Sequence, residues 1–137
     1  MSSRVAKNPV VGVELGYASI TSSVTQTGAG TQDVAGLAVT VNVGARPIMV
    51  RFEAGAISNT SASGLTVVKI MEGATTLGSA NLGLLTANGS APVSRSVRLA
   101  PSAGAHTYKI NLGQFVTGNS SITAAADNPA YIQVVEV

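Results

Sequence analysis

Cysteine and tryptophan are absent from this sequence, histidine occurs once, and charged residues make up only 10% of its 137 residues. Without cysteine, neither a disulfide scaffold nor a thiolate metal site is possible. No apolar run approaches the roughly 18 residues of a membrane-spanning helix, and the N-terminal residues lack the apolar core of a signal peptide. We therefore expect a protein that is synthesised and assembled in the cytoplasm and has no membrane partner.

The scarcity of charge also bears on partners. A soluble globular domain usually has about 25% charged residues, and the mean hydropathy here is +0.36. Too few charges remain to cover a monomer's surface, so burial against sister chains is the simplest expectation. The formal net charge is only +2, and the aromatic residues are 2 Phe and 3 Tyr. Because nucleic-acid binders cluster cations and interleave aromatic residues, we expect no nucleic acid as a partner.

Apolar and polar residues alternate along four segments of the chain. Such alternation over about four to eight residues, rich in Val, Ile and Thr, is typical of half-buried strands. The apolar members of the segments are Val39, Val41 and Val43; Ile48, Val50 and Phe52; Val93, Val97 and Leu99; and Tyr108, Ile110 and Leu112. We therefore expect a strand at each segment.

Clusters of Gly, Pro, Asn and Ser separate these segments and indicate turns. Gly73 and Gly118 adopt a positive φ at little cost, so each is expected to close a hairpin. The first hairpin pairs residues 65–71 with 75–82, and the second pairs residues 107–116 with 120–126. Three Asn-x-Ser/Thr triplets are interpreted as products of polar turns rather than as glycan acceptors; they begin at Asn59, Asn88 and Asn119.

Residues 65–71 and 130–137 are apolar on both faces of the expected strands. Successive side chains of a strand point to opposite faces, so Val67 and Val68 cannot both face the core. A subunit interface on the outer face explains the excess of apolar residues, and so does a covering loop. On the first explanation, the oligomer interface includes Val67, Met71, Tyr131 and Val135.

About eight or nine short strands without a helical pattern predict an all-β fold. We expect a single jelly-roll-like antiparallel β-sandwich over residues 17–137. Residues 1–16 are polar and lack alternation, so we interpret them as an extended N-terminal arm. A frayed terminus accounts for the same composition.

His106 is the sole histidine, and a Ser-His-Asp site would combine it with a serine and with Asp33 or Asp127. No Gly-x-Ser-x-Gly turn surrounds any serine, so a structural hydrogen bond is the favoured role of His106. The carboxylates lie in six different segments, as Glu14, Asp33, Glu53, Glu72, Asp127 and Glu136. Paired carboxylates and metal-binding motifs are therefore not expected. We predict no catalytic, metal-binding or cofactor-binding residues and no enzymatic activity.

Five stretches of the chain are distinctive as a set. They are residues 8–12 with 14–17, 39–44 with 46–48, 69–77, 99–109 and 128–136. The most specific are Ser-Ala-Gly-Ala-His-Thr-Tyr-Lys at 102–109 and Asn-Pro-Ala-Tyr-Ile at 128–132. Over nearly the whole chain, this order resembles small virion proteins from tailed phages of actinobacteria, which include head decoration (minor capsid) proteins and domains of minor tail proteins. Residues 133–137 depart from the acidic ending that is usual in that group.

The resemblance implies a jelly-roll-like sandwich, often trimeric, without enzymatic activity. We hypothesise a capsid decoration protein of the virion that binds the outer surface of the phage head as a homotrimer, with the major capsid protein as its partner. The arm residues expected to contact the capsid are Arg4, Lys7, Asn8 and Pro9. Two alternatives stay open: a tail-associated or receptor-binding module, and a cytosolic β-sandwich binding module unrelated to virions.

Overall fold

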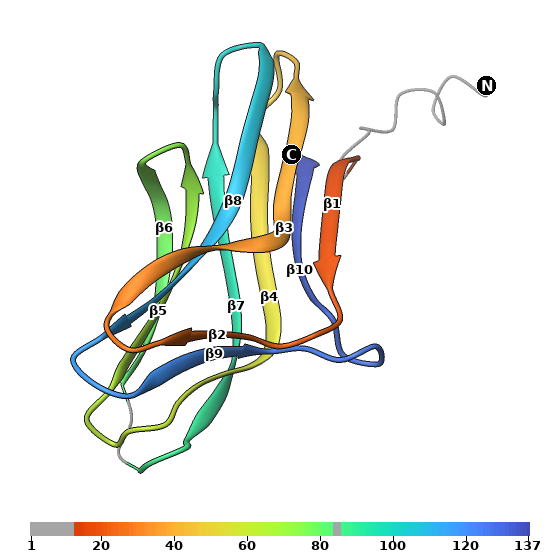
Figure 1. Ribbon diagram of the computed structural model, residues 1–137. Helices are drawn as coiled ribbons and strands as arrows, with labels where there is room; N and C mark the ends of the chain where they lie inside the picture. Colours follow the sequence, from red (N-terminus) through yellow and green to blue (C-terminus); the bar gives the residue numbers. More distant parts are fainter. Residues whose placement is uncertain (1–12, 84–85) are drawn as a thin grey trace.

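The computed structural model describes residues 13–83 and 86–137, which form ten β-strands and no helix (Figure 1). The strands are β1 (Glu14–Ile20), β2 (Val24–Thr27), β3 (Gly30–Val43), β4 (Ile48–Asn59), β5 (Leu65–Glu72), β6 (Thr75–Gly83), β7 (Ser90–Leu99), β8 (Gly104–Phe115), β9 (Asn119–Thr123) and β10 (Ala130–Glu136). Among these residues there is no helix long and apolar enough to cross a membrane. The all-β prediction is confirmed.

The strands form two antiparallel sheets that pack face to face, and β2 and β9 run across the lower end of the sandwich in Figure 1. Sheet A contains β1, β10, β4 and β7 and continues through β9 and β2, whereas sheet B has the order β3-β8-β5-β6. The pairing is nested: β1 pairs with β10, β2 with β9, β3 with β8, β4 with β7 and β5 with β6. One long antiparallel ribbon is thus rolled into two layers. This arrangement is a jelly roll and confirms the expected sandwich.

The core lies between the two sheets. All four alternating segments are confirmed as strands, within β3, β4, β7 and β8. Phe52, Tyr108 and Ile132 are among the largest side chains with less than 2% exposure. Burying an apolar side chain of this size contributes about 1.5–3 kcal/mol. Apolar burial between the sheets is therefore the main force that holds the sandwich together.

The first expected hairpin is confirmed, and the second is wrong. β5 and β6 pair around Gly73, whose φ is 59°. β8 pairs with β3 and β5 in sheet B, whereas β9 pairs with β2 and β4 in sheet A. Gly118 has the expected positive φ, 86°, but its turn carries the chain from one sheet to the other. A glycine between two strands indicates a sharp turn without specifying which sheet the next strand joins.

A buried polar cluster lies beside this crossing. Asn59, at the end of β4, is 1% exposed. Its Oδ1 accepts a hydrogen bond from the Ser61 N–H at 2.8 Å, and its Nδ2 donates to Ser120 Oγ at 3.2 Å. Ser120 Oγ also forms a hydrogen bond with Thr66 Oγ1, at 2.7 Å. The cluster links β4, β5 and β9 at the point where β4 ends and a polar turn begins.

The sandwich begins earlier than expected. β1 starts at Glu14 and pairs with β10, so residues 14–16 belong to the sandwich and a boundary at residue 17 lies too late. A register shift between Glu14 and Gly16 interrupts the alternation there. The Glu136 N–H donates to the Val13 carbonyl at 2.9 Å, which ties the start of the described chain to the C-terminal strand.

Candidate interaction surfaces

The described surface offers no concave site. No pocket is present among the described residues. Within residues 13–83 and 86–137, no group of three or more His, Asp or Glu side chains is placed to hold a metal ion. Small-molecule sites are usually clefts or cavities. The candidate sites are therefore side-chain clusters and the open faces of the sheets.

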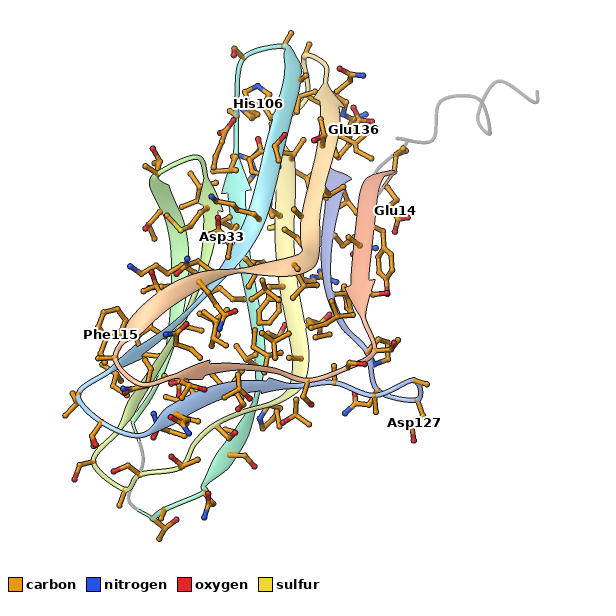
Figure 2. The ribbon with its side chains drawn as sticks, viewed as in Figure 1. Glu14, Asp33, His106, Phe115, Asp127 and Glu136 are labelled. Carbon is orange, nitrogen blue, oxygen red and sulfur yellow. The ribbon has the colours of Figure 1, made fainter. Side chains whose placement is uncertain are left out.

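His106 lies on β8 near the upper end of the sandwich in Figure 2. Its Nδ1 is 2.6 Å from Glu72 Oε2, and its Nε2 is 2.7 Å from the carbonyl oxygen of Ser102. Because a carboxylate and a carbonyl only accept hydrogen bonds, both ring nitrogens must donate, which requires the imidazolium form. The hydrogen bond to Glu72, and then that to Ser102, raises the pKa of His106 above its usual value of 6.5. His106 thus joins β5, β8 and the loop before β8.

Tyr108 extends this cluster into the core. Its ring is nearly parallel to that of His106, with the ring centroids 6.1 Å apart. The Tyr108 hydroxyl is buried and has no hydrogen-bond partner among the described groups. Burial, with a smaller contribution from the charge of Glu72, raises the pKa of Tyr108 to about 12. Tyr108 is therefore neutral near neutral pH, and both ring nitrogens of His106 donate to acceptors, so neither group offers a free basic atom to act as a general base.

The other members of a Ser-His-Asp site lie elsewhere. Ser102 contacts His106 through its main-chain carbonyl and not through its hydroxyl. Asp33, on β3, accepts a hydrogen bond from Lys109 Nζ at 2.7 Å, which is the main reason that the pKa of Asp33 lies below its usual value. Asp127 lies in the turn that precedes β10. Figure 2 shows His106, Asp33 and Asp127 in three separate regions of the molecule.

Four of the six acidic residues form hydrogen bonds across neighbouring strands. The pairs are Glu14 with Gln133, Asp33 with Lys109, Glu53 with Tyr131, and Glu72 with His106. None of these partners is another carboxylate. These acids therefore serve in cross-strand contacts.

The four predicted interface residues do not form one surface. Val67 and Met71 point outward from β5 in sheet B, whereas Tyr131 and Val135 point outward from β10 in sheet A. The two pairs therefore lie on opposite faces of the sandwich. In a closed ring of three subunits, the two contact patches of each subunit have outward normals about 60° apart. Opposite faces of one sandwich cannot close such a ring by contacting each other.

A neighbouring side chain, Phe115, covers the outer side of β5. Val67 is only 7% exposed, although it points away from the core. Its partner on β8 is Gly113, and a Cβ added to Gly113 would lie 2.7 Å from the Phe115 ring. Lys69 Nζ lies 5.9 Å from the centroid of the same ring. Val67 is thus buried within one molecule, beside a glycine over which the Phe115 ring lies, whereas Met71 further along β5 is half-buried.

The outward side chains of β1, β10, β4 and β7 form three rows across sheet A, which we call the sheet A face. From β1 to β7, the rows are Ser19, Tyr131, Glu53 and Ser94; Tyr17, Gln133, Arg51 and Ser96; and Glu14, Val135, Met49 and Arg98. The sheet A face therefore combines aromatic, charged, amide and apolar groups in one open array.

Contacts between neighbouring rows order the sheet A face. The rings of Tyr17 and Tyr131 stack with their centroids 5.3 Å apart, and Tyr17 is 47% exposed. The Tyr131 hydroxyl donates to the Glu53 carboxylate, which raises the pKa of Tyr131. The side chain of Arg51 is 43% exposed and lies 4.0 Å from Glu53. Because Tyr and Arg dominate the hot spots of protein interfaces, this face is the best candidate interaction surface.

Sequence reasoning found Tyr131 and Val135 on this face but missed Tyr17, Arg51 and Glu53. Arg51 and Glu53 are recognisable as the outward positions of an alternating strand. Tyr17 has a weaker signal, because the register shift in β1 breaks the alternation just before it.

The arm residues expected to contact a capsid are Arg4, Lys7, Asn8 and Pro9. They lie outside the described residues, which begin at Val13.

No family model matches this chain, and no curated protein matches it. Several solved structures are similar to it. The Eiger TNF of S. frugiperda matches at 9% identity with a TM-score of 0.55, over 90% of this chain and 93% of that chain. The delta-endotoxin Cry8Ea1 of Bacillus thuringiensis matches at 14% identity with a TM-score of 0.49, over 84% of this chain and 19% of that chain. A structure of infectious bursal disease virus, Gt strain, matches at 14% identity with a TM-score of 0.48, over 89% of this chain and 37% of that chain.

At these identities the likeness concerns the fold alone. Jelly-roll sandwiches serve many unrelated functions, so function has to be argued from the surfaces of this chain. The comparison with Eiger extends over nearly the whole of both chains. It agrees with the jelly roll that the nested strand pairing defines.

Proposed function

We propose that this chain is a virion structural protein, a decoration protein that binds the outer surface of a phage head and stabilises the shell. The proposal includes the major capsid protein as partner, an oligomer of the chain as the binding unit, and assembly in the host cytoplasm. A homotrimer at local threefold positions is the form that the resemblance favours.

The observation that carries the proposal is the sheet A face. It is an open array with half-exposed Tyr17 and Arg51, on a molecule whose described residues contain no pocket. Such a surface suits a macromolecular partner better than a small molecule. The resemblance to phage head proteins then supplies the class of partner.

We propose no catalytic role for the described residues. The ring of His106 is held by Glu72 and the Ser102 carbonyl, and both nitrogens are engaged. No serine hydroxyl takes part in that cluster. A binding protein needs no such chemistry.

Binding stabilises a capsid through linkage. A ligand that binds only the assembled shell shifts the equilibrium towards that shell, by about 2.7 kcal/mol per site at a concentration of 100 times the Kd. An oligomer that contacts several capsid subunits at once gains further through effective concentration. No enzymatic step is required for this stabilisation.

The test is binding of purified protein to mature, genome-filled phage heads that lack it. We expect co-sedimentation to approach saturation at many copies per head and to raise the temperature at which the heads open. Gold-labelled protein that decorates only tail tips in electron micrographs would contradict the proposal.

The role of the arm requires its own variant. Deletion of residues 1–12 leaves β1 intact, because this strand starts at Glu14. We expect the shortened chain to keep the circular-dichroism spectrum and melting temperature of the full chain and to lose binding to heads. The matched control replaces only Arg4 and Lys7 with Ser, which removes the two positive charges at constant length. Full binding by the deletion variant would remove the arm from the proposal.

A second candidate is a tail-associated or receptor-binding module. The stacked pair Tyr17 and Tyr131 favours it, because two of the few aromatic rings of the chain meet on one open face. Fluorescently labelled protein would bind whole host cells if this reading holds, and Tyr17→Ala would weaken that binding. Binding to heads but not to cells would reject it.

A further inference from the structure

The sheet A face carries a charge pattern that is complementary to itself. In its third row, Glu14 on β1 and Arg98 on β7 lie at opposite ends. Val135 and Met49 lie between them, on the two central strands. An acidic end and a basic end are thus separated by an apolar centre. A second copy that is turned by 180° presents the same groups in the reverse order.

The two-fold axis that relates the two copies lies in the plane of contact. It runs parallel to the strands and passes between β10 and β4. The rotation brings β1 of one copy opposite β7 of the other, and β10 opposite β4. Each Glu14 then faces the Arg98 of the second copy, and each Val135 faces a Met49. Sheets that pack face to face with nearly aligned strands are a common arrangement in proteins.

The second row fits the same axis. There Gln133 faces the Arg51 of the second copy, so that an amide oxygen can accept from a guanidinium. Arg51 is 43% exposed on its side chain and has donors available for such a contact. Opposite charges, an amide with a cation, and two apolar side chains therefore meet across one axis.

We propose that the sheet A face is a two-fold interface, through which two copies of this chain form a dimer in solution. An isologous contact of this kind uses one patch twice, so it avoids the problem that opposite faces cannot close a ring. The dimer concerns the assembly of the chain with itself. The proposed contact with a phage head uses this same face, so the dimer is the form of the free chain, and a subunit that binds a head through the sheet A face has to leave its dimer partner.

The size of the face sets the expected strength. Four strands about 4.8 Å apart and three rows about 6.8 Å apart give a footprint of about 400 Å² on each copy. Two footprints bury about 800 Å² when each face is treated as flat, without the area of the projecting side chains. This total is close to the lower limit of about 1,000 Å² for a specific interface. We therefore expect a dissociation constant on the order of 1–100 µM.

The test is sedimentation velocity of the full chain across this concentration range, with charge reversal at both ends of the third row. Glu14→Arg places two arginines opposite each other, and Arg98→Glu places two glutamates opposite each other. Each reversal occurs twice in a two-fold dimer, so each single variant is expected to raise the dissociation constant about tenfold or more. The double variant restores opposite charges and is expected to return close to the wild-type value.

Asp127→Arg is the matched control. It makes the same change of charge as Glu14→Arg, but at an exposed turn away from the sheet A face. We expect this control to dimerise like the wild type, and circular dichroism to show that all variants are folded. A wild-type chain that stays monomeric up to about 100 µM overturns the proposal. It is also overturned by single variants that dimerise normally, or by a double variant that does not recover.

Discussion

Replacement of Asn59 by alanine probes how the chain is carried from sheet B to sheet A. The substitution removes two hydrogen bonds, one from the Ser61 N–H at 2.8 Å and one to Ser120 Oγ at 3.2 Å. A typical hydrogen bond contributes about 1 kcal/mol net, and a buried group that loses its partner costs about 1–3 kcal/mol. Ser120 keeps its contact with Thr66, so the full penalty falls mainly on the Ser61 N–H. We expect a loss of about 2–3 kcal/mol in the free energy of unfolding.

The assay is urea unfolding followed by far-ultraviolet circular dichroism, since the chain has no tryptophan. A loss of this size is a large fraction of the roughly 5–15 kcal/mol that stabilises a domain. The matched control is Asn42→Ala, at an exposed position of β3, which is expected to change stability by less than about 0.5 kcal/mol. If the free energy of unfolding of Asn59→Ala stays within about 0.5 kcal/mol of the wild-type value, the cluster does not stabilise the crossing between the sheets.

Three further predictions concern the other clusters. Because the folded-state pKa of His106 is raised above 6.5, its contribution to stability is present below about pH 6.5 and is lost as the pH rises through the folded-state pKa. The urea midpoint of the wild type should therefore fall relative to that of His106→Gln between about pH 6 and pH 9, and parallel pH profiles would contradict this role. Tyr108→Phe removes a buried hydroxyl without a partner among the described groups, so thermal unfolding should show stability unchanged or raised by about 1 kcal/mol; a clear loss would imply an unseen hydrogen bond. Gly113→Val should displace the Phe115 ring and cost about 1–3 kcal/mol in urea unfolding. The double variant with Phe115→Ala should lose less than the sum of the two single losses, and additive losses would show that the ring does not lie over Gly113.

Local patterns were sufficient to predict most of the strands. The alternation of Val39, Val41 and Val43 with polar residues reflects one buried and one open face, which is a property of the strand itself. The turn at Gly73 closes a hairpin between adjacent segments, so its outcome also depends on nearby residues alone. These predictions succeeded because the decisive interactions lie close together in the sequence.

The failures depend on contacts between distant residues. Gly118 has a positive φ, as a hairpin glycine would, but β9 pairs with β4 on one side and with β2 on the other and so lies in the other sheet. Alternation shows that Val67 points away from the core, but only the fold brings Phe115 beside it. Tyr17 escaped notice because a register shift near the start of β1 disturbs the pattern. The candidate site was therefore predictable in part: β4, β7 and β10 were predicted as strands, but their adjacency in one sheet and the addition of Tyr17 from β1 were not.

The nested pairing of the strands sets the order in which the chain closes on itself. Only β5 and β6 are joined directly by a tight turn, and every other pair encloses the pairs inside it. Because the entropy cost of closing a loop grows with its length, we expect pairing to proceed outward from β5 and β6 and to reach β1 and β10 last. On a ribosome, β1 is made early and has to wait unpaired until β10 emerges. The sheet A face needs both strands, so it is complete only after β10 has been made and has paired with β1.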